Sequence, residues 1–142
     1  MQLLTANRTV YQKMDKLKTF TDSRGKLTLT QVGNEIPFSI ERAYWIYDVP
    51  EGEERGMHAN RISYQYLVAV SGSVDITLEN RGGRHTYHLN SKDKGLLVPP
   101  LTWNELTNFS RDAVLMVFAS HPYDTGTYIN SHEEFLKLIQ SR

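Results

Sequence analysis

The sequence predicts an all-β domain of the jelly-roll type, a barrel or sandwich closed by one short C-terminal helix. Short segments rich in β-branched and aromatic residues follow one another along most of the chain, with glycine- or proline-containing turns between them. Only the C-terminal segment repeats apolar side chains at helical spacing. The 142 residues fit a single domain, 1–142, that is long enough to bury a core.

Each strand has a pattern of its own. Residues 26–32 alternate apolar with polar side chains, which is the period of a half-buried strand, and residues 40–49 carry a run of aromatic residues. The turn Ser71-Gly72-Ser73 separates two further strands, and Asn80-Arg81-Gly82-Gly83 marks another turn. The predicted strands are residues 26–32, 40–49, 62–70, 74–78, 85–89, 95–98 and 113–119.

The sequence predicts a definite structure for the C-terminal end of the chain but not for the N-terminal end. At the C-terminus Asn130-Ser131 offers an N-cap, acidic residues follow, and an apolar stripe begins at Phe135, so a helix is expected. Residues 1–13 fit an N-terminal arm or an edge strand as well as they fit disorder, and the sequence leaves these alternatives open.

Composition excludes several classes of function. Sixteen basic and sixteen acidic residues cancel, so no charge footprint indicates a nucleic acid partner. The absence of cysteine excludes disulfides and thiolate metal sites. No apolar run suits a membrane helix or a secretory signal. We expect a soluble, cytoplasmic protein with no membrane partner.

The candidate chemical site is the stretch Arg55-Gly56-Met57-His58-Ala59-Asn60. Residues two apart on a strand point to the same side, so His58 and Asn60 share a face. The imidazole can accept and donate a proton near neutral pH. The amide cannot titrate, but it can donate a hydrogen bond to a developing oxyanion.

We expect neither a metal nor another cofactor at this site. A jelly-roll metal site would need a second imidazole where Asn60 stands, and an amide binds transition metals poorly. Residues 99–108 contain no histidine, and His85 and His88, three apart in a predicted strand, face opposite sides.

Many short motifs in a fixed order resemble one family, the nucleotide-sugar 3,4-ketoisomerases, which are cupin-fold enzymes also called WxcM-like. The resemblance runs from about residue 22 to residue 139. The segments that carry it are residues 22–25, 36–40, 42–50, 55–59, 70–73, 94–96, 99–103, 119–120, 123–124, 128–129 and 134–136.

The resemblance implies a specific activity. Such enzymes move the ketone of dTDP-4-keto-6-deoxyglucose from C4 to C3 through an enediol, on the way to amino sugars of surface polysaccharides. They are metal-free homodimers that exchange N-terminal strands. They carry two acid/base histidines: His58 matches the first, and Asn60 stands in place of the second. Arg24 and Asn104 match variable pocket positions that bear on the configuration at C4.

Further residues are candidates for binding a nucleotide sugar. The guanidinium groups of Arg42 and Arg55 suit a pyrophosphate, and tyrosine hydroxyls suit sugar or phosphate oxygens. Each of these side chains also has a purely structural interpretation as a surface charge, a core aromatic or a plug of the barrel mouth. The remaining substrate-binding candidates are Tyr44, Tyr47, Tyr64, Trp103 and Glu105.

Asn60 sharpens the stereochemical expectation. In a gluco-configured 4-keto sugar, a base that removes the C3 proton and returns it to C4 from the same face gives a galacto centre at C4. His58 alone could perform both transfers, so we predict the galacto product. The alternatives are a non-catalytic sugar-nucleotide-binding cupin and a related isomerase or epimerase whose chemistry is altered by Asn60.

Overall fold

The computed structural model describes residues 11–141 and confirms a mostly β fold with one C-terminal helix. The predicted N-terminal arm lies largely outside the described residues; within them, the chain enters β1 at Lys13. The strands are β1 (Lys13–Lys16), β2 (Lys18–Asp22), β3 (Gly25–Leu29), β4 (Arg42–Tyr47), β5 (Arg55–Asn60), β6 (Gln65–Ser71), β7 (Val74–Asn80), β8 (Gly83–Leu89), β9 (Lys94–Val98), β10 (Trp103–Thr107), β11 (Val114–Ala119) and β12 (Tyr128–Ile129). The helices are the 3₁₀ turn η1 (Thr125–Thr127) and α1 (His132–Gln140).

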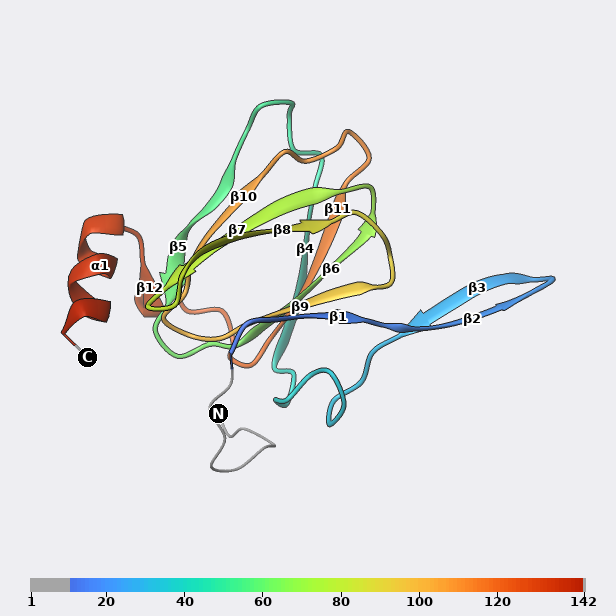
Figure 1. Cartoon of the computed structure of the whole chain (residues 1–142), viewed down its shortest axis with the longest axis horizontal. Coiled ribbons are helices and arrows are strands. Elements are labelled where there is room, and N and C mark those ends of the chain that lie inside the picture. Colours follow the sequence, from blue (N-terminus) through green and yellow to red (C-terminus); the bar gives the residue numbers. More distant parts are fainter. Residues whose placement is uncertain (1–10, 142) are drawn as a thin grey trace.

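Two antiparallel sheets form the body of the molecule (Figure 1). One has the order β1-β9-β6-β11-β4 and the other has the order β12-β5-β10-β7-β8. Neighbouring strands in each sheet are mostly distant in sequence, as in a jelly roll. Every predicted strand overlaps an observed one, and β1, β2, β5, β10 and β12 lie outside the predicted ranges.

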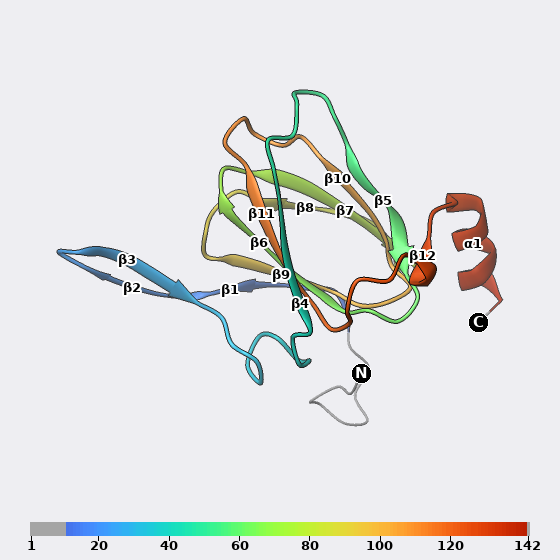
Figure 2. The same ribbon diagram turned by 180° about the vertical axis from the view of Figure 1, so that it is seen from behind.

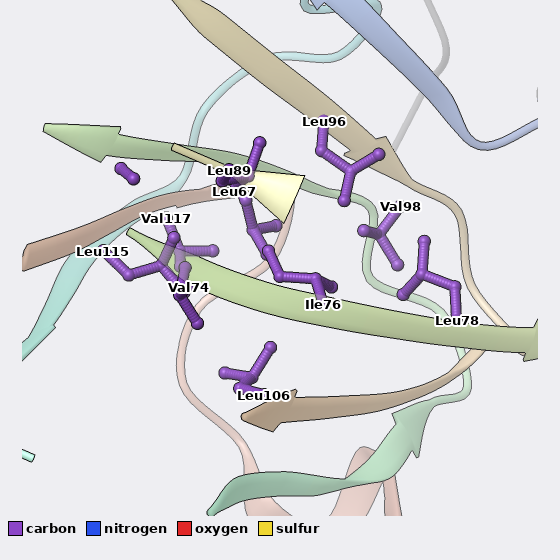
Figure 3. Close-up of a cluster of buried hydrophobic side chains, with 11 residues drawn as sticks. Leu67, Val74, Ile76, Leu78, Leu89, Leu96, Val98, Leu106, Leu115 and Val117 are labelled. Carbon is purple, nitrogen blue, oxygen red and sulfur yellow. The ribbon is translucent and has the colours of Figure 1, made fainter. Parts of the chain in front are cut away.

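The core lies between the two sheets and is almost entirely aliphatic. Alternate residues of β7 point inward, so Val74, Ile76 and Leu78 are buried. In Figure 3 Val74 lies beside Val117, Ile76 near Leu67 and Leu78 beside Val98, all three partners coming from the facing sheet. Burying a side chain of this size stabilises the fold by roughly 1.5–3 kcal/mol, so the sandwich holds itself together without disulfides.

The β2–β3 hairpin leaves this body and projects to one side (Figures 1 and 2). All residues of β2 are exposed, and Phe20 and Leu27 are 51% and 57% exposed. At its tip Arg24 donates to the carboxylate of Asp22, with its backbone N 2.8 Å from Oδ1. Within residues 11–141 nothing covers Phe20 and Leu27, and an isolated two-stranded hairpin is only marginally stable in water.

Helix α1 lies at the opposite end of the molecule, beyond β5 and β12 (Figure 1). Its N-cap is Ser131, whose hydroxyl accepts a hydrogen bond from the backbone N of Glu134 at 3.2 Å, in agreement with the predicted cap. Phe135 is fully buried in a cluster with Ala59, Trp103 and Ile129. The helix therefore covers the outer side of the strands that carry the candidate site. Among residues 11–141, no helix is long and apolar enough to cross a membrane.

Candidate active site

A cavity of about 420 Å³ opens between β4, β5, β10 and the C-terminal segment. Its floor is formed by core residues of the sandwich, and its walls carry the polar groups. The residues that line it include no aspartate and no glutamate, whereas Arg42 and Arg55 both reach it. The side chains or backbone at its surface belong to Arg42, Tyr44, Trp45, Ile46, Arg55, Gly56, His58, Gln65, Leu67, Asn104, Leu106, Val117, Tyr123 and Tyr128.

A β-bulge in β5 shapes the cavity wall. Asn104 of β10 pairs with His58, but the next residue, Glu105, pairs with Gly56, so Met57 is an extra residue. Both Gly56 and Met57 have positive φ, 83° and 59°. A Cβ at Gly56 would collide with the Oδ1 of Asn104, so only glycine allows this approach of the two strands.

His58 is half-buried in the wall, and its two ring nitrogens differ. Nδ1 lies 3.2 Å from the carbonyl oxygen of Gly56, so Nδ1–H donates to that carbonyl and Nε2 is left without a proton. Burial lowers the pKa of His58 below its usual value, although the Gly56 hydrogen bond opposes the shift. His58 is therefore a neutral base at neutral pH.

Arg42 lies between two aromatic rings in the same cavity. Its guanidinium carbon is 5.1 Å from the ring centroid of Tyr44 and 5.6 Å from that of Tyr123. No ion pair to Arg42 is formed within residues 11–141, and its buried Nε has no hydrogen-bond partner there. A half-buried guanidinium without a carboxylate suits an anionic ligand.

The Tyr44 hydroxyl accepts a hydrogen bond from Nε2 of Gln65 at 3.0 Å. Burial raises the pKa of Tyr44 to about 12, and the positive charge of Arg42 offsets only part of that rise. The hydroxyl thus stays protonated at neutral pH, and its own proton is free to donate to a ligand in the cavity.

Asn60 is more deeply buried than His58, the other candidate in the same motif. It is 4% exposed, it is absent from the cavity lining, and its Oδ1 finds no hydrogen-bond partner among the described residues. His58 is the sole imidazole among the described residues that line the cavity.

The structure brings together five of the residues singled out in the sequence, namely Arg42, Tyr44, Arg55, His58 and Asn104. Besides Asn60, five others lie outside the cavity of their own chain. Alternation explains three of them, because Tyr47 lies three residues from Tyr44 and Trp103 and Glu105 flank Asn104, so each points to the opposite face of its strand.

These outward residues have structural partners. The indole Nε1 of Trp103 donates to Oε2 of Glu105 at 3.1 Å, and Trp103 packs under α1. Tyr64 packs near Phe38, with ring centroids 6.2 Å apart, in a separate apolar cluster. Arg24 lies at the exposed hairpin tip, where it forms an ion pair with Asp22.

Three polar cavity residues, Gln65, Tyr123 and Tyr128, were not predicted from the sequence to belong to the site, although both tyrosines lie in segments that carry the family resemblance. Gln65 could have been noticed because it is a polar residue at the start of an apolar, buried strand. The two tyrosines come from the loop and short strand before α1, whose return to the cavity depends on long-range pairing of β12 with β5.

The described part of the chain holds no group of three metal-ligating side chains close enough to bind an ion. A second cavity, of about 730 Å³, lies between the β2–β3 hairpin and the outer face of β6 and β11. Its lining is mainly apolar and includes Leu17, Val68 and Phe118. Although larger, it is lined by no histidine, and the ionisable side chains in its lining are Lys26, Lys92 and Asp93.

Comparison with known proteins identifies the family. Residues 11–140 match the family model described as "FdtA: WxcM-like, C-terminal". The chain belongs to the WxcM-like FdtA family. The TDP-4-oxo-6-deoxy-alpha-D-glucose-3,4-oxoisomerase of Aneurinibacillus thermoaerophilus is a relative that is 39% identical over 127 residues, which are 89% of this chain and 91% of the relative. The resemblance identified in the sequence is confirmed.

Solved structures of WxcM-like enzymes share the fold of this chain. QdtA, a sugar 3,4-ketoisomerase from Thermoanaerobacterium thermosaccharolyticum solved in complex with TDP, is 33% identical, with a TM-score of 0.87 over 92% of this chain and 96% of QdtA. WlaRB, a TDP-quinovose 3,4-ketoisomerase from Campylobacter jejuni, is 38% identical, with a TM-score of 0.84 over 89% of this chain and 97% of WlaRB.

Proposed function

We propose that this protein is a sugar-nucleotide 3,4-ketoisomerase that moves the ketone of a dTDP-4-keto-6-deoxyhexose from C4 to C3. The observation that carries the proposal is His58, a neutral base in a cavity that also presents two arginines and no carboxylate. Relatives named for this reaction, and solved relatives that hold TDP and TDP-4-keto-6-deoxyglucose, support the same substrate class. The product would feed deoxyamino-sugar and surface polysaccharide biosynthesis.

The chemistry follows from the groups in the cavity. The ketone at C4 acidifies the C3 proton, which Nε2 of His58 accepts, and an enediolate forms with its negative charge on the C4 oxygen. The C3 hydroxyl proton passes to the C4 oxygen, so that the negative charge moves to the C3 oxygen. The protonated imidazole then returns its proton to C4, which leaves a ketone at C3 and a hydroxyl at C4. The Tyr44 hydroxyl is free to donate a hydrogen bond to a sugar or enediolate oxygen, and the two arginines suit the diphosphate.

Asn60 is proposed to support this site without carrying a proton. Its amide lies on the same strand face as His58 but is buried, so His58 is left to perform both transfers. A single base on one face of the ring gives the galacto configuration at C4. Related Campylobacter jejuni structures are named for TDP-fucose and for TDP-quinovose, so family membership alone does not decide this point.

The second candidate function is a non-catalytic sugar-nucleotide-binding protein, favoured by the absence of a second imidazole from the cavity lining. Incubation with dTDP-4-keto-6-deoxyglucose, followed by NMR of the sugar, separates the two functions. We expect the 3-keto isomer from the wild type and none from His58→Asn. Tight binding of the substrate by calorimetry with no turnover would favour the binding protein.

We further propose a homodimer that exchanges N-terminal strands. The projecting β2–β3 hairpin supports this, because its apolar residues Phe20 and Leu27 and the outward Trp45 are each more than half exposed. The apolar cavity beneath the hairpin lies on the same outer sheet face. We also propose a cytoplasmic location, which the cysteine-free sequence supports.

The dimer would account for the position of Arg24. In its own chain this residue lies at the tip of the projecting hairpin, away from the cavity. In a strand-exchanged dimer the hairpin tip would reach the partner, and Arg24 would complete the partner's site. Sedimentation equilibrium tests the dimer, with Phe20→Glu expected to yield monomers because it would bury a charge in the interface.

A further inference from the structure

The ring of Tyr128 lies face to face with the imidazole of His58. The two ring centroids are 4.8 Å apart, and the planes differ by 17°. Offset stacking of this kind is worth about 0.5–1.5 kcal/mol beyond the area that it buries. Both side chains are half-buried and line the same cavity, so the stack lies at the candidate base itself.

Tyr128 is held in this position by its backbone. It lies in β12, where it pairs directly with Asn60 of β5, and paired residues project from the same face of a sheet. On one side the backbone N of Arg61 donates to the carbonyl of Thr127 at 2.9 Å. On the other side Ile129 is fully buried beneath α1. The ring thus leans on His58 from a fixed strand rather than from a free loop.

Two contacts together fix the imidazole. The hydrogen bond from Nδ1 to the Gly56 carbonyl fixes which nitrogen carries the proton, but a single hydrogen bond allows the ring to tilt about it. The face-on contact with Tyr128 opposes that tilt. With both contacts in place, Nε2 keeps one direction, which is what repeated proton transfer between two adjacent carbons requires.

The surroundings of His58 contain few other titratable groups. Among the cavity-lining residues these are Arg42 and Tyr44 from β4, Arg55 from β5, and Tyr123 beside Tyr128 in the C-terminal segment, whereas β10 contributes only the neutral Asn104 at this level. The Tyr123 ring meets Tyr128 edge-on, at 6.5 Å between centroids. The His58 imidazole therefore has two defined contacts in the cavity, the hydrogen bond to the Gly56 carbonyl and the stack on Tyr128.

We propose that Tyr128 is a positioning residue for His58, acting through its aromatic ring rather than its hydroxyl. The inference rests on the proposed function for its kinetic consequence, but the stack itself can be tested without turnover. Because the ring also covers one face of the imidazole from water, its loss exposes His58. Burial is what lowers the pKa of His58, so exposure moves that pKa back toward its ordinary value.

The test compares Tyr128→Phe, which keeps the ring, with Tyr128→Leu, which removes it. We expect the Phe variant to stay within about twofold of wild-type kcat, and the Leu variant to lose about tenfold or more in kcat with a smaller change in KM. In NMR titrations of the His58 imidazole, the Leu variant should titrate at higher pH and the Phe variant as the wild type does. Tyr47→Leu, which removes an exposed tyrosine outside the cavity, is the control and should leave the titration of His58 unchanged.

Several outcomes would overturn the inference. A Phe variant as slow as the Leu variant would assign the effect to the hydroxyl, and a Leu variant with wild-type kcat and titration would remove Tyr128 from any such role. Tyr128→Met, with a longer aliphatic side chain, replaces the Leu variant if the latter does not fold. If the wild type turns over no 4-keto sugar, the proposed function fails, and the titration still shows whether the ring positions and covers His58.

Discussion

Arg55 and His58 line the same cavity although they lie three residues apart in one strand. In a regular strand such residues point to opposite faces. The extra residue of the bulge, Met57, changes the alternation and brings the guanidinium and the imidazole to one side. The proposed base and one of the proposed diphosphate ligands thus owe their proximity to a backbone irregularity.

The bulge can be tested by replacing the glycine that permits it. Gly56→Ala places a Cβ at positive φ and against the Asn104 side chain, so we expect a loss of unfolding free energy of about 1–3 kcal/mol from backbone strain together with a larger loss of activity. Chemical denaturation measures the first effect, and the NMR product assay measures the second.

Gly52→Ala is the matched control for this substitution. Gly52 has a φ of 82°, almost that of Gly56, but a Cβ there would meet nothing within 4 Å. Gly52→Ala should therefore lower the unfolding free energy through similar backbone strain, but it should leave the activity at the wild-type level. Equal losses of activity in the two variants would show that the contact between Gly56 and Asn104 is not what shapes the cavity.

The pH dependence should report His58. Its pKa lies below the ordinary value of 6.5 because of burial, so half of the His58 imidazoles become protonated only at a pH below 6.5. As the pH falls and the base is protonated, kcat/KM should decrease along an acid limb whose midpoint lies below pH 6.5. His58→Gln should lower kcat by about 10²–10⁴-fold and abolish this limb.

The same shift has a consequence for folding. The pKa of His58 is lower in the folded state than in the unfolded state, so between these two pKa values the unfolded state binds more protons. The contribution of His58 to the unfolding free energy is therefore fully present above the unfolded pKa, and it is lost as the pH falls through the folded pKa. Denaturation curves between pH 5 and 7 should show a smaller pH dependence for His58→Gln than for the wild type. For the kinetic prediction, a fall in kcat/KM at low pH that persists in His58→Gln would show that a group other than His58 causes it.

The sequence was sufficient for the fold class and for part of the site. The strands over residues 74–78 and 113–119 and the helix cap near Ser131 depend on local sequence, and each appears in the structure where it was predicted. The bulge at Met57 is not local, because it depends on the register between β5 and β10. Likewise β10 carries few β-branched residues, and its pairing between β5 and β7 makes it a strand.

The configuration of the product tests the single-base interpretation of Asn60. We expect a product with the small H4–H5 coupling of a galacto centre, because His58 would take the C3 proton and return a proton to C4 on the same face. NMR of the dTDP-sugar formed in ordinary water measures this coupling, and a parallel reaction in deuterated buffer shows, by loss of the H4 signal, whether solvent hydrons reach C4. A large, gluco-type H4–H5 coupling would require a second acid on the opposite face or a reoriented ring, and would exclude the single-base pathway.

Mixed dimers can show whether Arg24 acts in the partner's site. Arg24→Glu and His58→Asn should each be inactive alone, since one lacks the hairpin guanidinium and the other lacks the base. When the two variants are unfolded together and refolded in equal amounts, half of the dimers are mixed, and each mixed dimer pairs an intact His58 with the Arg24 of the other chain. We therefore expect about a quarter of wild-type activity to return. If Arg24 served the cavity of its own chain, no mixed dimer would hold a complete site and the refolded mixture would stay inactive.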